Sequence, residues 1–177
     1  MTIKERYTGV LSLLAQEWPT ADSELHFENA YQLLVAVMLS AQCTDKRVNM
    51  VTPALFTAYP TVEQLAIASA DDVLQYIKSV SYPNSKSTHL VEMAKRVVEV
   101  YNGQIPNKRE ELQTLAGVGR KTANVICAVW WNQPTMAVDT HIFRVAERIG
   151  LTTNAKNPLE SEKQLIKHIP EDIIPKA

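Results

Sequence analysis

The 177-residue sequence contains few of the residues that would indicate a metalloprotein or a disulfide-linked secreted domain. It has two cysteines, Cys43 and Cys127, which lie far apart and lack the Cys-x-x-Cys spacing of structural zinc and redox sites. Its four histidines form no His-x-x-x-His pair. We therefore predict two buried thiols in a reducing compartment and no metal site.

The sequence also lacks a charge excess and a long hydrophobic run. Its formal net charge is −1, whereas nucleic-acid-binding domains are often basic. Any contact with nucleic acid would therefore need a local patch of basic side chains together with oriented backbone N–H groups. No long stretch is free of charged residues and the N-terminus lacks a signal-peptide pattern, so we expect a protein of the cytoplasm with no membrane partner.

No segment of useful length alternates between polar and apolar residues, so no sheet is expected and the fold class is all-α. Residues 28–42 are apolar on all sides in the middle, which predicts a central buried helix. Asn102-Gly103 predicts a left-handed helix end. Cap residues followed at the third position by Gln, Asp or Glu predict helix starts at Thr61, Ser69 and Asn107. Further helices are expected at 3–16, 45–58, 85–101, 139–149 and 157–168, with Pro53 kinking or splitting the second of these.

Glycine is scarce, and two of the five glycines, Gly117 and Gly119, fall in the stretch "LAGVGRKTANV". The stretch matches neither a Walker A loop nor a dinucleotide-binding fingerprint, because Thr114, Arg120 and Thr122 occupy required positions. The remaining interpretation of this stretch is two helices joined by a short hairpin. Glycines there permit positive φ and leave N–H groups uncovered, so the turn and the following helix N-terminus could bind a phosphodiester. A plain corner between two helices is an equal alternative.

Arg120 and Lys121 stand in the first turn of that second helix, where the helix dipole already places about half a positive charge. Cations are normally found at the opposite end. Their position favours an anion-binding role for Arg120. The positive field of the helix terminus and Arg120 also disfavours the protonated form of Lys121.

Together with its neighbours, "LAGVGRKTANV" resembles the helix–hairpin–helix of the endonuclease III family of DNA glycosylases. "LLVAVMLSAQCTD" (33–45) and "AVDTHIFRVAERIGL" (137–151) are similar to the family's other signature blocks, with "IKSVSYPNSKSTHL" (77–90) between them. The resemblance covers about residues 3–172. It implies two helical lobes with a DNA groove between them: a six-helix barrel at 22–134, with the helix–hairpin–helix at about 109–131, and a second lobe of 1–21 and 135–177.

The resemblance assigns Lys121 as the nucleophile. A neutral amine can attack the sugar C1′, expel the base and remain attached as a Schiff base, from which β-elimination releases the 3′ phosphate. Partial burial against apolar walls is expected to help keep this amine neutral. Asp139 has the position of a helix N-cap, and the resemblance adds a catalytic role in stabilising the sugar cation.

The resemblance also implies DNA contacts. Gln42 would enter the duplex where the flipped nucleotide had been, and Tyr82 occupies the position of an apolar wedge, although packing on its own loop is nearly as plausible. Asp45 would line the lesion pocket. Phosphate or other DNA contacts are expected from Lys86, Gly117, Gly119, Arg120, Thr140 and His141.

The sequence departs from the family in two respects. Relatives typically continue into a loop whose four cysteines hold a [4Fe–4S] cluster; here the two cysteines cannot replace it, so no cofactor is expected in this chain unless the natural protein continues past Ala177. We expect a second lobe that is incomplete at its C-terminus. Ala116 also replaces the usual hairpin proline.

The expected function is a base-excision-repair glycosylase with AP lyase activity, acting as a monomer on oxidised pyrimidines in duplex DNA, in the bacterial cytoplasm or nucleoid. The alternatives are a non-catalytic helix–hairpin–helix DNA-binding module and a glycosylase for another damaged base.

Overall fold

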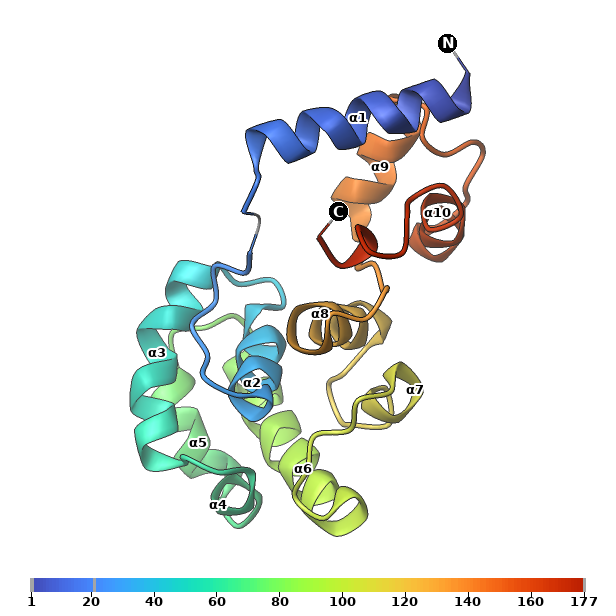
Figure 1. Ribbon diagram of the computed structural model, residues 1–177. Helices are drawn as coiled ribbons and strands as arrows, with labels where there is room; N and C mark the ends of the chain where they lie inside the picture. Colours follow the sequence, from blue (N-terminus) through green and yellow to red (C-terminus); the bar gives the residue numbers. More distant parts are fainter. Residues whose placement is uncertain (1, 21, 177) are drawn as a thin grey trace. The chain divides into compact units, whose positions relative to one another are not determined.

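The computed structural model describes residues 2–20 and 22–176, and within these ranges the fold is all-α (Figure 1). The elements are α1 (Ile3–Glu17), α2 (Ala30–Ser40), α3 (Asp45–Ala58), α4 (Val62–Ala66), α5 (Ala70–Ile77), α6 (Pro83–Tyr101), α7 (Arg109–Leu112), α8 (Arg120–Trp131), α9 (Thr140–Arg148), α10 (Pro158–Leu165) and the short 3₁₀ helix η1 (Ile174–Lys176). No helix in the described part of the chain is long and apolar enough to cross a membrane.

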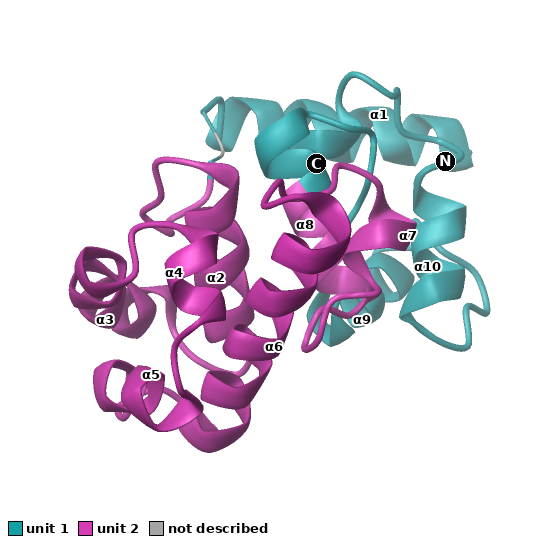
Figure 2. Cartoon of the chain, turned by 90° about the horizontal axis from the view of Figure 1, so that it is seen from below, with its two compact units in different colours: residues 1–22, 127–177 teal, residues 23–126 magenta. Residues whose placement is uncertain are grey.

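The chain forms two compact units. Unit 1 consists of residues 1–22 and 127–177, and unit 2 of residues 23–126 (Figure 2). The second boundary between the units lies inside α8. The barrel-and-lobe organisation itself stays a prediction.

Unit 2 is built around α2 and α6. The predicted central helix is confirmed, because every residue of α2 from Leu33 to Leu39 is buried. Helix α6 packs against α2, α4 and α5 and ends, as predicted, at Asn102 in the left-handed conformation (φ 52°).

The local signals for helix starts are confirmed in two of the three predicted places. Thr61 forms a reciprocal capping box with Gln64, and the Ser69 hydroxyl accepts from the Asp72 N–H. The predicted cap at Asn107 is wrong by one residue, since α7 begins after Lys108, whose side chain makes no capping hydrogen bond. Helix α3 runs through Pro53 without being split.

Unit 1 packs α1 against the segment around α9 and α10. The Tyr7 hydroxyl donates to the Leu151 carbonyl (2.7 Å) and Arg6 donates to the Gly150 carbonyl (2.9 Å), so α1 is tied to the chain that follows α9. The core beneath these bonds consists of Tyr7, Met136, Val138, Ala146, Leu165, Ile169 and Ile174.

Candidate functional site

The helix–hairpin–helix consists of α7, the turn 113–119 and the start of α8. Its apolar side chains face inward: Leu112, Leu115, Val118 and Ala123 are all buried. Successive backbone hydrogen bonds close the turn, from Leu115 N–H to Leu112 O (3.0 Å) and from Val118 N–H to Leu115 O (3.1 Å). The turn is therefore a defined structure whose remaining polar groups face outward.

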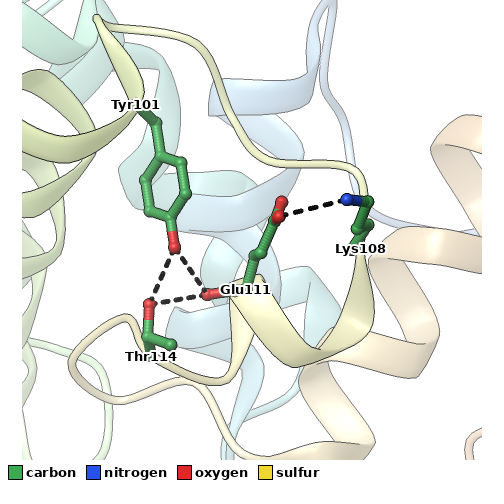
Figure 3. Close-up of polar contacts among 4 residues, drawn as sticks. All are labelled: Tyr101, Lys108, Glu111 and Thr114. Carbon is green, nitrogen blue, oxygen red and sulfur yellow. Dashed lines mark hydrogen bonds and ion pairs between the residues drawn. The ribbon is translucent and has the colours of Figure 1, made fainter.

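Polar contacts fix α7 against the end of α6 (Figure 3). The Thr114 hydroxyl donates to the Glu111 carbonyl (2.7 Å) and lies 3.1 Å from the Tyr101 hydroxyl. Arg96 of α6 donates to the same Thr114 oxygen (3.1 Å), and Lys108 forms an exposed ion pair with Glu111 (3.5 Å). These bonds limit rotation of the hairpin relative to α6, so the outward groups keep a constant direction.

The two hairpin glycines have different roles. Gly117 has φ 73°, and a Cβ there would lie 3.0 Å from His89 Cβ and 3.1 Å from Met38 Cε. Gly119 does not use the positive φ that glycine permits, and a Cβ there would meet open space. Gly117 is thus required by backbone conformation and packing, whereas Gly119 leaves its exposed backbone uncovered beside the start of α8.

Helix α8 begins with Arg120, which is half-buried, and Lys121, which is exposed. The buried face of the helix passes through Ala123, Ile126 and Cys127, and Lys121 lies off that face. The partial burial expected for Lys121 is therefore not found. The side chain that the resemblance assigns as nucleophile is instead accessible to a ligand.

Glu110 on α7 responds to the cations of the hairpin. Its own backbone hydrogen bond and its bond from Arg109 (2.7 Å) lower the pKa of this exposed carboxyl, and the charge of Arg120 contributes further in the same direction. The Glu110 carboxylate is therefore close enough to Arg120 to interact with its charge. A phosphate bound at Arg120 would compete with Glu110 for that charge.

Gln42 and Tyr82 lie on two exposed turns that precede helices. Gln42 has φ 54° in the turn between α2 and α3, and Tyr82 has φ 52° immediately before α6, with 65% of its surface exposed. The Ser81 hydroxyl donates to the Gln42 carbonyl, so the two turns are adjacent. The structure therefore brings together two of the residues for which DNA insertion is expected.

Lys86 has an environment unlike that of a phosphate contact. Its side chain is buried, and the ammonium donates to the carbonyls of Leu39 and Ala41, both at 2.7 Å. Burial lowers the pKa of Lys86, and the neighbouring Cys43 side chain acts in the opposite direction. The ammonium points into unit 2, which corrects the expectation that it would face a DNA backbone.

Asp45 is the first residue of α3 and is half-buried. Burial raises the pKa of its carboxyl, and the neighbouring Glu24 raises it further. The loop carrying Glu24 is held to α3 by Asn49, whose side chain donates to the Glu24 carbonyl (2.8 Å). Asp45 thus combines a polar group with partial desolvation, as a residue lining a pocket for a polar base would.

In unit 1, Asp139 is the N-cap of α9, as predicted. One carboxylate oxygen accepts from the backbone N–H groups of His141 and Ile142, both at 2.9 Å. Thr140 and His141 are exposed in the first turn of the same helix, and the His141 ring lies 3.2 Å from Arg144. The carboxylate is therefore held in one orientation by the backbone.

Unit 1 also has a hollow of about 330 Å³ lined almost entirely by apolar side chains of α1, α9 and the segments around them, including Leu14, Val145 and Leu165. His141 is the only residue expected to contact DNA that lines it. An apolar lining does not suit a phosphate backbone or a polar base, so this hollow is not the candidate site.

The described residues do not fit an iron–sulfur cluster. A [4Fe–4S] cluster needs four thiolates, whereas Cys43 is half-exposed after α2 and Cys127 is buried in α8. Across residues 2–20 and 22–176, no three or more His, Cys, Asp or Glu side chains are grouped closely enough to hold a metal ion.

Three segments of unit 2 converge at Gly117: the hairpin, α2 through Met38 and α6 through His89. The turns of Gln42 and Tyr82 lie at the ends of these same two helices. Sequence reasoning gave no role to Met38, His89 and Ser81, although they lie within the quoted stretches 33–45 and 77–90, because their contacts are with residues distant in the sequence. For Lys86 there was a signal, because it continues the apolar face formed by Leu90, Ala94 and Val97.

Comparison with known proteins supports a repair function. Residues 35–171 match the family model described as HhH-GPD superfamily base excision DNA repair protein. Endonuclease III of Synechocystis sp. (strain ATCC 27184 / PCC 6803 / Kazusa) is 41% identical over 169 residues, covering 95% of this chain and 77% of that protein. Endonuclease III of Escherichia coli (strain K12) is 37% identical over 169 residues, covering 96% of this chain and 80% of that protein.

Solved structures agree with these relatives. A trapped covalent intermediate of endonuclease III with DNA matches with a TM-score of 0.94 and 39% identity, covering 99% of this chain and 83% of that chain. A non-covalent endonuclease III–DNA complex matches with a TM-score of 0.93 and 38% identity, covering 99% and 82%. The chain belongs to the endonuclease III family of the HhH-GPD superfamily and is an endonuclease III-like base excision repair DNA glycosylase.

Proposed function

We propose that this chain removes oxidised pyrimidines from duplex DNA and then cleaves the resulting abasic site by β-elimination, with Lys121 as the nucleophile. The observation that carries the proposal is the position of Lys121: an exposed amine in the first turn of α8, directly after the glycine turn and Arg120. Its family relatives include an endonuclease III crystallised as a covalent intermediate with DNA.

The chemistry requires no group beyond protein side chains. The neutral Lys121 amine attacks C1′, the bond from C1′ to the base breaks, and the base leaves with a proton from the attached nitrogen. The nitrogen lone pair then opens the sugar ring: the C1′–O4′ bond breaks, O4′ takes up a proton, and C1′ and the nitrogen form the protonated imine. The resulting imine acidifies the C2′ proton; loss of that proton expels the 3′ phosphate, and water then hydrolyses the imine to free the amine. At an abasic site the same amine condenses with the aldehyde and water is lost.

Binding is proposed to rest on the hairpin. The backbone around Gly119, the N-terminus of α8 and Arg120 present positive charge without any base-reading side chain, which suits a phosphodiester of any sequence. Gln42 fills the space of the extruded nucleotide, Tyr82 stacks on bases, and Asp45 lines the pocket that receives the lesion. Extrusion costs a few kcal/mol, which the inserted side chains offset in part.

Asp139 is proposed to stabilise the positive sugar and to transfer protons. Two backbone N–H groups hold its carboxylate, so little reorganisation is needed when charge develops. Thr140 and His141, exposed in the first turn of α9, are proposed as further DNA contacts.

Borohydride reduction in the presence of abasic-site duplex tests the proposal. Wild-type protein should form a covalent adduct that survives denaturation, and Lys121→Gln should form none while still binding the duplex. A wild-type protein that binds abasic DNA but forms no adduct would be a helix–hairpin–helix binding module instead. Release of a damaged purine in preference to an oxidised pyrimidine would assign the chain to another lesion.

A further inference from the structure

The two turns that carry Gln42 and Tyr82 share an unusual backbone conformation. Both residues have φ close to 50°, the left-handed region that side chains with a Cβ rarely adopt. A bulky aromatic residue is especially uncommon there. Such conformations persist only where the surrounding structure holds them, and they are concentrated at functional sites.

The groups that hold them come from the start of α6 and from the turn just before it. The buried Lys86 ammonium donates to the carbonyls of Leu39 and Ala41, both at 2.7 Å, at the C-terminal end of α2. The Ser81 hydroxyl donates to the carbonyl of Gln42. Carbonyls at a helix end have no partner within the helix, so external donors determine the path of the chain that follows.

The same segment holds Tyr82. The Lys86 backbone N–H donates to the Tyr82 carbonyl (3.1 Å), and Pro83 follows Tyr82 at the first position of α6. Lys86 therefore bonds to the Tyr82 turn through its backbone and to the Gln42 turn through its ammonium. The two turns are thus joined through a single residue.

We propose that Lys86 and Ser81 are positioning residues that fix Gln42 and Tyr82 in register for simultaneous insertion into the DNA duplex. This inference rests on the proposed function, because it gives the two side chains a duplex to enter. Neither Lys86 nor Ser81 contacts the DNA; they act through the carbonyls of Leu39, Ala41 and Gln42. A buried ammonium suits this purpose, since a charged donor forms stronger hydrogen bonds than a neutral one.

The test compares an abasic site in a duplex with the same abasic site in a single strand. Insertion of Gln42 and Tyr82 is needed to extrude a nucleotide from a duplex but not from a single strand. Lys86→Met removes hydrogen bonds from a charged group and should slow borohydride-trapped adduct formation on the duplex by at least about tenfold. Ser81→Ala removes one neutral hydrogen bond and should slow it by about two- to tenfold, and both variants should leave the single-strand rate within about twofold. Ser81→Thr keeps the hydroxyl and should retain the wild-type rate ratio.

Ser87→Ala is the matched control. Ser87 is a buried hydroxyl of the same helix, and its hydrogen bond to the Asn84 carbonyl (2.9 Å) does not reach the α2 end. It should change the duplex and single-strand rates by the same factor. If Lys86→Met fails to fold, as judged by circular dichroism, the half-buried Ser81 variants decide the outcome.

A second readout does not depend on the covalent chemistry. A 2-aminopurine placed opposite the abasic site should change its fluorescence when wild-type protein binds, and Ser81→Ala should reduce that change at saturating protein. No adduct on either substrate together with a normal fluorescence change would refute the proposed lyase and leave the positioning role in place. Equal loss on both substrates, or an unchanged fluorescence signal in Ser81→Ala, would overturn the positioning role.

Discussion

Replacing each hairpin glycine by alanine separates two roles that the sequence presents as equivalent. Both substitutions reduce the entropy of the unfolded chain by the same amount, so this gain of ~0.4–1 kcal/mol cancels when the variants are compared. Gly117 alone has a left-handed φ of 73°, which costs a residue with a Cβ about 1–2 kcal/mol. The new methyl group would also lie 3.0 Å from His89 Cβ, which is fixed to the α6 backbone.

We therefore expect Gly117→Ala to be less stable than Gly119→Ala by at least ~1–2 kcal/mol, a difference of roughly 2–8 °C in Tm for a protein of this size. Thermal unfolding followed by circular dichroism measures it. Gly119→Ala should keep or exceed wild-type stability but weaken abasic-DNA binding, because it covers the exposed backbone beside α8. Equal stability of the two variants would refute the argument, as would a Gly119→Ala variant that unfolds first.

Three further predictions concern charged groups. Arg120→Ala should weaken DNA binding equally for all sequences and reduce the slope of log K against log salt by about 0.9, one phosphate's share; an unchanged slope would exclude a phosphate contact. Because burial and Glu24 raise the pKa of Asp45, its ionised form is disfavoured in the folded state, so Asp45→Asn should raise stability at pH 7. That gain should vanish below about pH 4, where the carboxyl is protonated in both states; a loss of stability at pH 7 would mean that the helix-terminal charge dominates. Asp139→Asn should keep the cap of α9, whereas Asp139→Ala should lose ~1 kcal/mol of stability. Both variants should slow base release; a wild-type rate in Asp139→Asn would show that the carboxylate serves only as a helix cap.

Much of the fold could be predicted from the sequence because the signals are local. Capping boxes such as Thr61–Gln64 and the Asn102 helix end involve residues a few positions apart, so the chain's own chemistry decides them. The cap at Asn107 was misplaced by one residue because the N-cap of α7 is Lys108, a residue type that is not a usual cap and whose side chain makes no capping hydrogen bond.

The non-local features could not be predicted in the same way. Nothing within the hairpin indicates that Gly117 packs on Met38 and His89 while Gly119 faces open space. The bond from Ser81 to the Gln42 carbonyl joins residues 39 positions apart. Lys86 is an intermediate case: helical periodicity places it on the buried face of α6, but not which carbonyls its ammonium meets.

The central claim is that the Lys121 amine forms the covalent bond to DNA. Borohydride-reduced adduct with abasic-site duplex can be digested with a protease and a nuclease and mapped by tandem mass spectrometry. The account predicts that the reduced sugar is attached to Lys121 and that the modified peptide disappears in Lys121→Gln. Attachment to another lysine in the wild-type protein, or to the N-terminal amine, would contradict it.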